Sequence, residues 1–204
     1  MKVSSESKVF LLLLPLLFLV CAELVGPALA AEKAELPVLL TSCGQSLGPE
    51  KLKIFLKKLQ LDHVYNAQAT AKELVEKKNS GAPFKSIIIV TGSSLKGMGA
   101  AGVSINDELA RAKALIEEAK RQGIKIIGAH VEGMARRSQG AAPGDNSDEQ
   151  SIDAVCPFSS VLLIKKEGNE DGRFTTISKE KNIPMIEFEK NAELEQVLRN
   201  LFAR

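Results

Sequence analysis

Three polar stretches, each following a run of apolar residues, carry the side chains best suited to hold a ligand. They read TSCGQS at 41–46, TGSSLKGMG at 91–99 and AHVEGMARR at 129–137. Glycine lets main-chain N–H groups approach an anion closely, and serine hydroxyls and basic side chains add hydrogen bonds and charge. We expect a small anion, a carboxylate or a phosphate, to bind here; the alternative is that the stretches are solvated connections. The predicted ligand-binding residues are Ser42, Cys43, Gly44, Gln45, Ser46, Gly92, Ser93, Ser94, Lys96, Gly97, His130, Glu132, Arg136 and Arg137.

Catalysis by the same stretches is a second interpretation. His130 and Glu132 would supply a base and its partner, and Ser93, Ser94 or Cys43 a nucleophile, for an extracytoplasmic hydrolase or transferase. Neither GxSxG nor HExxH occurs in the chain. His130 can equally be a hydrogen-bonded residue at a strand end, and Cys43 a small residue in a tight turn. Whether the protein is an enzyme stays open, and binding without catalysis is favoured.

Cofactor and metal patterns are missing or incomplete. Residues 97–102 spell GxGxxG, but these glycines begin well beyond the preceding apolar run and not in the tight turn that dinucleotide binding requires. The glycine, lysine and hydroxyl spacing of a P-loop is absent. The chain has two histidines without zinc-ligand spacing, and one Tyr and no Trp to flank a flavin ring. We therefore expect no cofactor and no metal site.

Apolar runs that alternate with helical patterns position these stretches. The strand-like runs are PVLLTS at 37–42, LDHVYNA at 61–67, SIIIV at 86–90, IKIIG at 124–128, FSSVLLIKK at 158–166 and IPMIEFE at 183–189. Between the third and fourth runs lies the clearest helix, which begins at Ile105 after a Ser104 and Asp107 cap and ends at Gly123. Such alternation predicts a parallel sheet of five or six strands between two helical layers, a three-layer α/β/α sandwich.

The second run decides between two strand orders. It is short and polar, with Asp62, His63 and Asn66, and suits a sheet edge, whereas SIIIV is wholly apolar and suits the centre. This favours the order 2-1-3-4-5-6, a flavodoxin-like (Rossmann-like) arrangement, over 3-2-1-4-5-6. Ligands of such sheets bind outside the carboxyl ends of the strands at the switch point, here between the first and third strands. The polar stretches should meet there.

The first thirty residues read as an export signal. Lys2 and Lys8 precede the apolar run Val9–Val20, and Ala28 and Ala30 stand where a signal peptidase reads small residues. We expect cleavage after Ala30 and delivery to the periplasm, the cell surface or the medium, with no membrane span afterwards. An uncleaved anchor and a lipoprotein built on the cysteine at 21 are the alternatives. Residues 1–30 are thus the predicted signal peptide and 31–204 a single α/β domain.

Charge and composition exclude some partners. The chain has 204 residues, 45% apolar and 25% charged, with a net charge of +2, so it lacks the basic surface typical of nucleic-acid binding. A third interpretation, an interaction module of an envelope or transport complex, rests on residues 131–147. That stretch shows no periodicity, which is typical of a binding loop or a disordered loop. A protein partner would then contact this loop.

The polar stretches also carry a resemblance. TSCGQS, VTGSSLKGMGAAG, IIGAHVEGMARR and VLLIKKEGNEDGRFT together resemble an uncharacterised family of exported bacterial single-domain α/β proteins, a domain of unknown function. The similarity extends over essentially all of residues 36–203. It implies a bacterial origin, export and importance of these loops, and it assigns no catalytic role to any residue.

Overall fold

A computed structural model describes residues 33–137 and 146–202. The predicted signal peptide, residues 1–30, lies outside the described residues, as does the middle of the 131–147 stretch. Six parallel strands form one sheet in the order β2-β1-β3-β4-β5-β6, which confirms the predicted fold class and strand order. The strands are β1 (Val38–Cys43), β2 (His63–Tyr65), β3 (Ser86–Thr91), β4 (Lys125–His130), β5 (Val161–Lys165) and β6 (Met185–Phe188).

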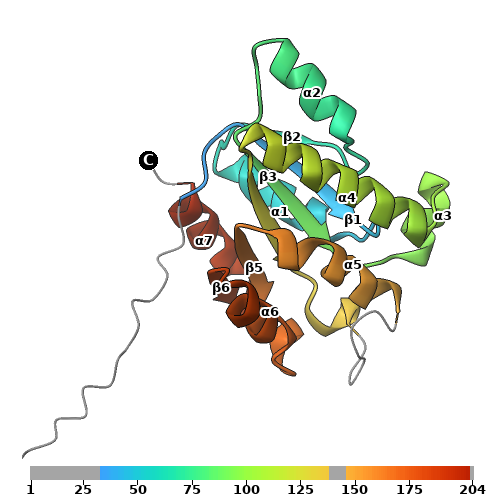
Figure 1. Cartoon of the computed structure of the whole chain (residues 1–204). Coiled ribbons are helices and arrows are strands. Elements are labelled where there is room, and N and C mark those ends of the chain that lie inside the picture. The colour runs from blue at the N-terminus through green and yellow to red at the C-terminus, as the bar shows by residue number, and fades with distance from the viewer. Residues whose placement is uncertain (1–32, 138–145, 203–204) are drawn as a thin grey trace, which may run out of the picture.

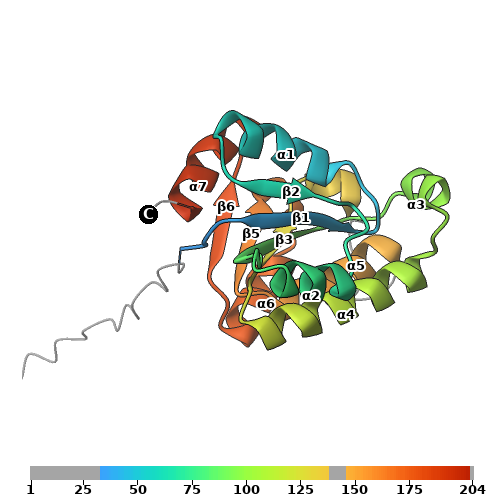
Figure 2. The ribbon, with the colours of Figure 1, turned by 90° about the horizontal axis from the view of Figure 1, so that it is seen from above.

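Helices cover both faces of the sheet, as Figure 2 shows from above. Helices α1 and α7 lie on one face, and α2, α4, α5 and α6 lie on the other. The helices are α1 (Gly48–Lys58), α2 (Ala71–Asn79), α3 (Leu95–Ala101), α4 (Ile105–Gln122), α5 (Ser147–Val155), α6 (Arg173–Lys181) and α7 (Leu194–Leu201). Short 3-10 turns are η1 (Gly133–Arg136), η2 (Cys156–Phe158), η3 (Lys166–Asn169) and η4 (Asn191–Glu193). No helix in the described part of the chain has the length and apolar character needed to span a bilayer.

The alternation of side chains along the strands explains the two-sided core. Leu40 and Ile88 pack on the α1 and α7 side, while Leu39 and Ile87 pack on the α2 and α4 side. Because successive side chains of a strand point to opposite faces, a strand buried on both faces must be apolar throughout. Strand β3 meets this condition and lies in the interior of the sheet, whereas the half-buried β2 lies at an edge.

Local signals set the bounds of α4. The Ser104 hydroxyl accepts a hydrogen bond from the Asp107 N–H, and the Asp107 carboxylate accepts one from the Ser104 N–H, so the predicted capping box is present. Gly123 ends the helix with a φ of 72°, a left-handed conformation that glycine adopts without strain. These are the bounds that the sequence predicted.

Helix α3 forms where the sequence suggested a loop. Its glycines have low helix propensity, but the Ser94 side chain accepts a hydrogen bond from the Gly97 N–H and caps the first turn. Met98 is buried, and Gly102 ends the helix in the left-handed region. The resulting seven-residue helix projects from the body of the molecule (Figures 1 and 2).

The two ends of the described chain meet. The Ala34 N–H donates a hydrogen bond to the Leu201 carbonyl at 2.8 Å. Ala34 precedes β1 and Leu201 ends α7, and Figure 1 shows α7 on the side of the molecule opposite α3. The predicted binding stretches are therefore far from both ends of the described chain.

Candidate functional site

The loops after β1 and β3 pack directly on each other at the switch point. Gln45 and Ser93 form an isolated antiparallel bridge. A Cβ atom on Gly44 would lie 2.6 Å from the Gly92 carbonyl oxygen, and one on Gly97 would clash with the Gln45 carbonyl. Gly44 and Gly92 also have positive φ angles of 104° and 127°. The structure thus brings these predicted residues together, and their glycines permit contact between two backbones.

The main-chain N–H groups of these loops are already bonded to side chains of the same protein. The Gly44 N–H donates to Glu108 Oε2 at 2.8 Å, and the Gly48 N–H donates to Glu132 Oε2 at 2.9 Å. The Ser93 N–H donates to Asp148 Oδ1 at 2.5 Å. Internal carboxylates therefore take the Gly44, Gly48 and Ser93 N–H groups, and the Gly92 and Gly97 N–H groups donate to serine hydroxyls.

One of these carboxylates belongs to a buried ion pair. Arg111 Nη2 lies 2.8 Å from Glu108 Oε2 and donates to the Ser42 carbonyl at 2.6 Å. Arg111 Nη1 donates to the Ala69 carbonyl at 2.8 Å. The pair therefore ties α4 to the ends of β1 and to the segment before α2. The sequence did not predict this pair, although Glu108 and Arg111 have the i, i+3 spacing at which side chains on a helix meet.

A second group, which we call the Ser93 cluster, consists of Ser93, Glu132, Arg136 and Asp148. Arg136 Nη1 donates to the Ser93 carbonyl at 2.8 Å, and Arg136 Nε lies 3.7 Å from Glu132 Oε1. Nε is buried without a hydrogen-bond partner among the described residues. Burial raises the pKa of the Asp148 carboxyl, although the Ser93 N–H and Arg136 act in the opposite direction. The cluster thus holds one carboxylate on a main-chain donor beside a guanidinium with an unused donor.

His130 is buried and fully bonded. Its Nδ1 lies 3.1 Å from Thr91 Oγ1, its Nε2 lies 3.0 Å from the Gly133 carbonyl oxygen, and its ring contacts Phe174 with 5.1 Å between centroids. The pKa of the imidazole is lowered to about 4, mainly by burial and also by the Arg137 charge, while the Gly133 hydrogen bond acts in the opposite direction. His130 is therefore a neutral residue that connects β4 to neighbouring backbone.

Cys43 is also buried, at the end of β1. The pKa of its thiol is raised to about 12, mainly by burial and also by the nearby Glu108 carboxylate. Cys43 and Cys156 are both free and buried in the structure. A thiol with so little thiolate at neutral pH is a poor nucleophile.

The remaining predicted residues have separate surroundings. Arg137 is fully buried, with Nε 2.5 Å from Glu149 Oε1 and Nη2 2.5 Å from Asp171 Oδ2, and it belongs to an internal ion-pair network. Lys96 is exposed on α3. The Ser42 hydroxyl donates to the Ala67 carbonyl at 3.0 Å. The side-chain nitrogen of Gln45 donates to Glu108 Oε2, and Ser46 Oγ accepts from the Gly48 N–H.

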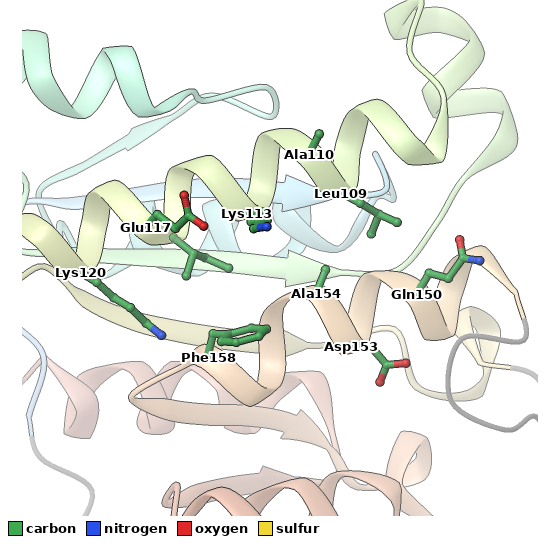
Figure 3. Close-up of a pocket in the computed structure, with 10 residues that line it drawn as sticks. Leu109, Ala110, Lys113, Glu117, Lys120, Gln150, Asp153, Ala154 and Phe158 are labelled. Carbon is green, nitrogen blue, oxygen red and sulfur yellow. The ribbon is translucent and has the colours of Figure 1, made fainter.

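The structure also contains a recess that sequence analysis did not predict. A cavity of about 660 Å³ lies between α4 and α5 (Figure 3), and no residue of the Ser93 cluster lines it. Within the described residues, no three His, Cys, Asp or Glu side chains converge as they would around a metal ion.

Comparison with protein-family models identifies the family of this chain. A family model described as Domain of unknown function (DUF6305) matches residues 35–202. A comparison with curated proteins finds no match.

Several solved structures are weakly similar, and three of them illustrate the level of similarity. They are the psychrotrophic esterase EstA from Pseudoalteromonas sp. (11% identity, covering 80% of this chain and 92% of that chain, TM-score 0.32), the RcsB response regulator from Salmonella typhimurium (11%, 80% and 66%, 0.33) and a GDSL-like lipase from Bacteroides thetaiotaomicron (12%, 74% and 66%, 0.33). Similarities at this level carry no inference about activity.

Proposed function

Because this chain belongs to the DUF6305 family, a domain of unknown function, we propose a function from its own side chains. The protein is an exported bacterial binding protein that takes a small carboxylate or phosphate at the carboxyl ends of β1, β3 and β4. The Ser93 cluster forms the binding site, with the Ser93 N–H and Arg136 as the donors. The signal-like sequence of residues 1–30 supports export.

One contact carries this proposal. The Ser93 N–H already binds a carboxylate oxygen of Asp148 at 2.5 Å, beside the Arg136 guanidinium. A main-chain donor next to a guanidinium is a general anion-binding arrangement. The anionic group of a ligand would replace the Asp148 carboxylate and take the unused Nε donor of Arg136. Ligand and Asp148 therefore compete for the same donor.

The side chains support binding over catalysis. A nucleophile needs a base within hydrogen-bond reach, and the two ring nitrogens of His130 are bonded to Thr91 and to the Gly133 carbonyl. The raised pKa of the Cys43 thiol disfavours attack by a thiolate. The hydrolase alternative thus lacks an activated nucleophile among the described residues.

The test compares two variants with opposite expected effects. Thermal unfolding is measured with phosphate, short mono- and dicarboxylates and nucleotides. A ligand at a hundred times its dissociation constant stabilises the native state by about 2.7 kcal/mol. Asp148→Ala frees the Ser93 N–H and should bind tighter than wild type, while Arg136→Gln should lose the shift. Asp62→Ala and Arg199→Gln, which remove exposed charges elsewhere, are the matched controls.

Two results would contradict the proposal. One is the absence of any stabilisation in both wild type and Asp148→Ala. The other is a shift that Arg136→Gln leaves unchanged. Urea unfolding of each variant without ligand checks that the substitutions preserve the fold.

A further inference from the structure

The recess between α4 and α5 is a groove with an apolar floor. We call it the α4–α5 groove; the residues used below are Leu109, Lys113, Ile116, Lys120, Ala154 and Phe158, which Figure 3 shows from the side of the two helices. Its volume of about 660 Å³ lies within the roughly 300–1,000 Å³ typical of small-molecule sites. A groove of this size between two helices of one chain suits a small ligand.

The floor exposes apolar surface that the fold itself does not cover. Leu109 from α4 and Ala154 from α5 are partly exposed in it, and the buried Ile116, 4% exposed, lies at its base. Phe158, in the 3-10 turn after α5, is 49% exposed. Ala154 is small, so the helices leave space above it, and Phe158 forms one end of this space (Figure 3). An apolar chain along the floor would remove this surface from water.

The rim adds a cationic side. Lys113 and Lys120 are two turns apart on α4, about 10 Å along the helix axis, and both line the groove. Lys120 Nζ lies 5.0 Å from the centroid of the Phe158 ring, and Lys113 has no hydrogen bond or ion pair with the described residues. Of the acidic rim residues, Asp153 is paired with Arg173, which leaves Glu117 against two lysines. The rim therefore favours an anionic head group.

We propose that the α4–α5 groove binds a single-chain amphiphile with a carboxylate head, such as a medium-chain fatty acid. The alkyl chain lies on the floor formed by Leu109, Ala154 and Phe158. The carboxylate lies at Lys113, the rim lysine that the described structure leaves without a partner. This site is separate from the Ser93 cluster, and it stands whether or not that cluster binds an anion.

The test titrates the protein by calorimetry with octanoate and decanoate, below their micelle concentrations. Each methylene that enters the groove should tighten binding by about fourfold. Decanol and decyltrimethylammonium carry the same chain without the negative charge and should bind more weakly. Lys113→Gln should weaken decanoate by about fivefold and leave decanol unchanged. The exposed Lys179→Gln on α6 is the matched control.

Filling the groove separates specific binding from adsorption. Ala154→Phe places a ring over the floor and should abolish the binding of both decanoate and decanol. Phe158→Ala removes the exposed end of the floor and should weaken both, which keeps the test decisive if Ala154→Phe fails to fold. The proposal is overturned if wild type binds no amphiphile, or if the folded groove variants bind decanoate as wild type does. It is also overturned if sedimentation shows a dimer that these variants dissociate, because a second copy would then occupy the groove.

Discussion

The buried imidazole of His130 should make the stability of this protein fall in mildly acidic solution. Its pKa is about 4 in the folded protein, against an ordinary value of 6.5. Above pH 6.5 the ring is neutral in both states, and its contribution to stability is fully present. As the pH falls from there towards 4, the unfolded chain binds a proton that the native state excludes. A pKa difference of this size corresponds to about 3 kcal/mol, of which about 2 kcal/mol is lost by pH 5.

The assay is urea-induced unfolding of wild type and His130→Gln near neutral pH and near pH 5. Glutamine cannot take up the proton, so the variant should lose about 2 kcal/mol less stability than wild type over this interval. Any packing defect from the substitution is present at both pH values and cancels in the comparison. His63→Gln, on the half-buried edge strand β2, removes the other histidine of the chain and is the control.

Two observations would contradict this account of His130. Equal pH dependence of unfolding in wild type and His130→Gln would mean that the ring does not couple folding to protonation. A native-state NMR titration of the His130 ring with a midpoint near 6.5 would mean that burial does not disfavour its charged form. Either result would return His130 to the candidates for acid–base chemistry.

Other substitutions test the loop contacts and the buried thiol. Glu108→Gln leaves Arg111 buried without its carboxylate partner and should destabilise the protein by about 3–5 kcal/mol in urea unfolding. The exposed Glu117→Gln on the same helix should change stability by less than about 0.5 kcal/mol. Equal effects of the two substitutions would contradict the buried-pair interpretation. Gly97→Ala should lower the free energy of unfolding by about 2 kcal/mol or more, because the new Cβ meets a carbonyl of the neighbouring loop. Gly99 has open space around it, so Gly99→Ala should raise the free energy of unfolding by up to about 1 kcal/mol. Cys43 should resist iodoacetamide near pH 8 until the protein is unfolded, and labelling of the native state at the rate of a free cysteine would show that its thiol is accessible.

The sheet could be predicted because its information is local. The apolar run in β3 indicates a strand buried on both faces, and the polar run in β2 indicates an edge strand. Together they predict the observed strand order. The bounds of α4 followed from Ser104 and Gly123 in the same way, since a cap is a short-range signal. Helix α3 was missed because a single serine cap and one buried methionine outweigh its weak glycine propensities.

The site could be located but not described from the sequence. Its loops meet where the strand order requires, yet the partners of their N–H groups, Glu108 and Asp148, come from distant helices. No spacing rule links such pairs, because they depend on how α4 and α5 pack on the sheet. The glycines were predicted to bring main-chain N–H groups close to a ligand. In the structure, Gly44 and Gly97 instead allow the backbones of two loops to pack closely. The α4–α5 groove likewise depends on helix packing.

The contact between Ala34 and Leu201 determines how this domain can be joined to anything else. Ala34 precedes β1 and Leu201 ends α7, so both lie at the amino ends of the strands, whereas the loops that carry the Ser93 cluster follow the strands. An affinity tag, a fused protein or a surface attachment joined next to Ala34 or Leu201 should therefore lie at the opposite end of the domain from the cluster. A short linker between these two positions would allow circular permutation without crossing the binding loops.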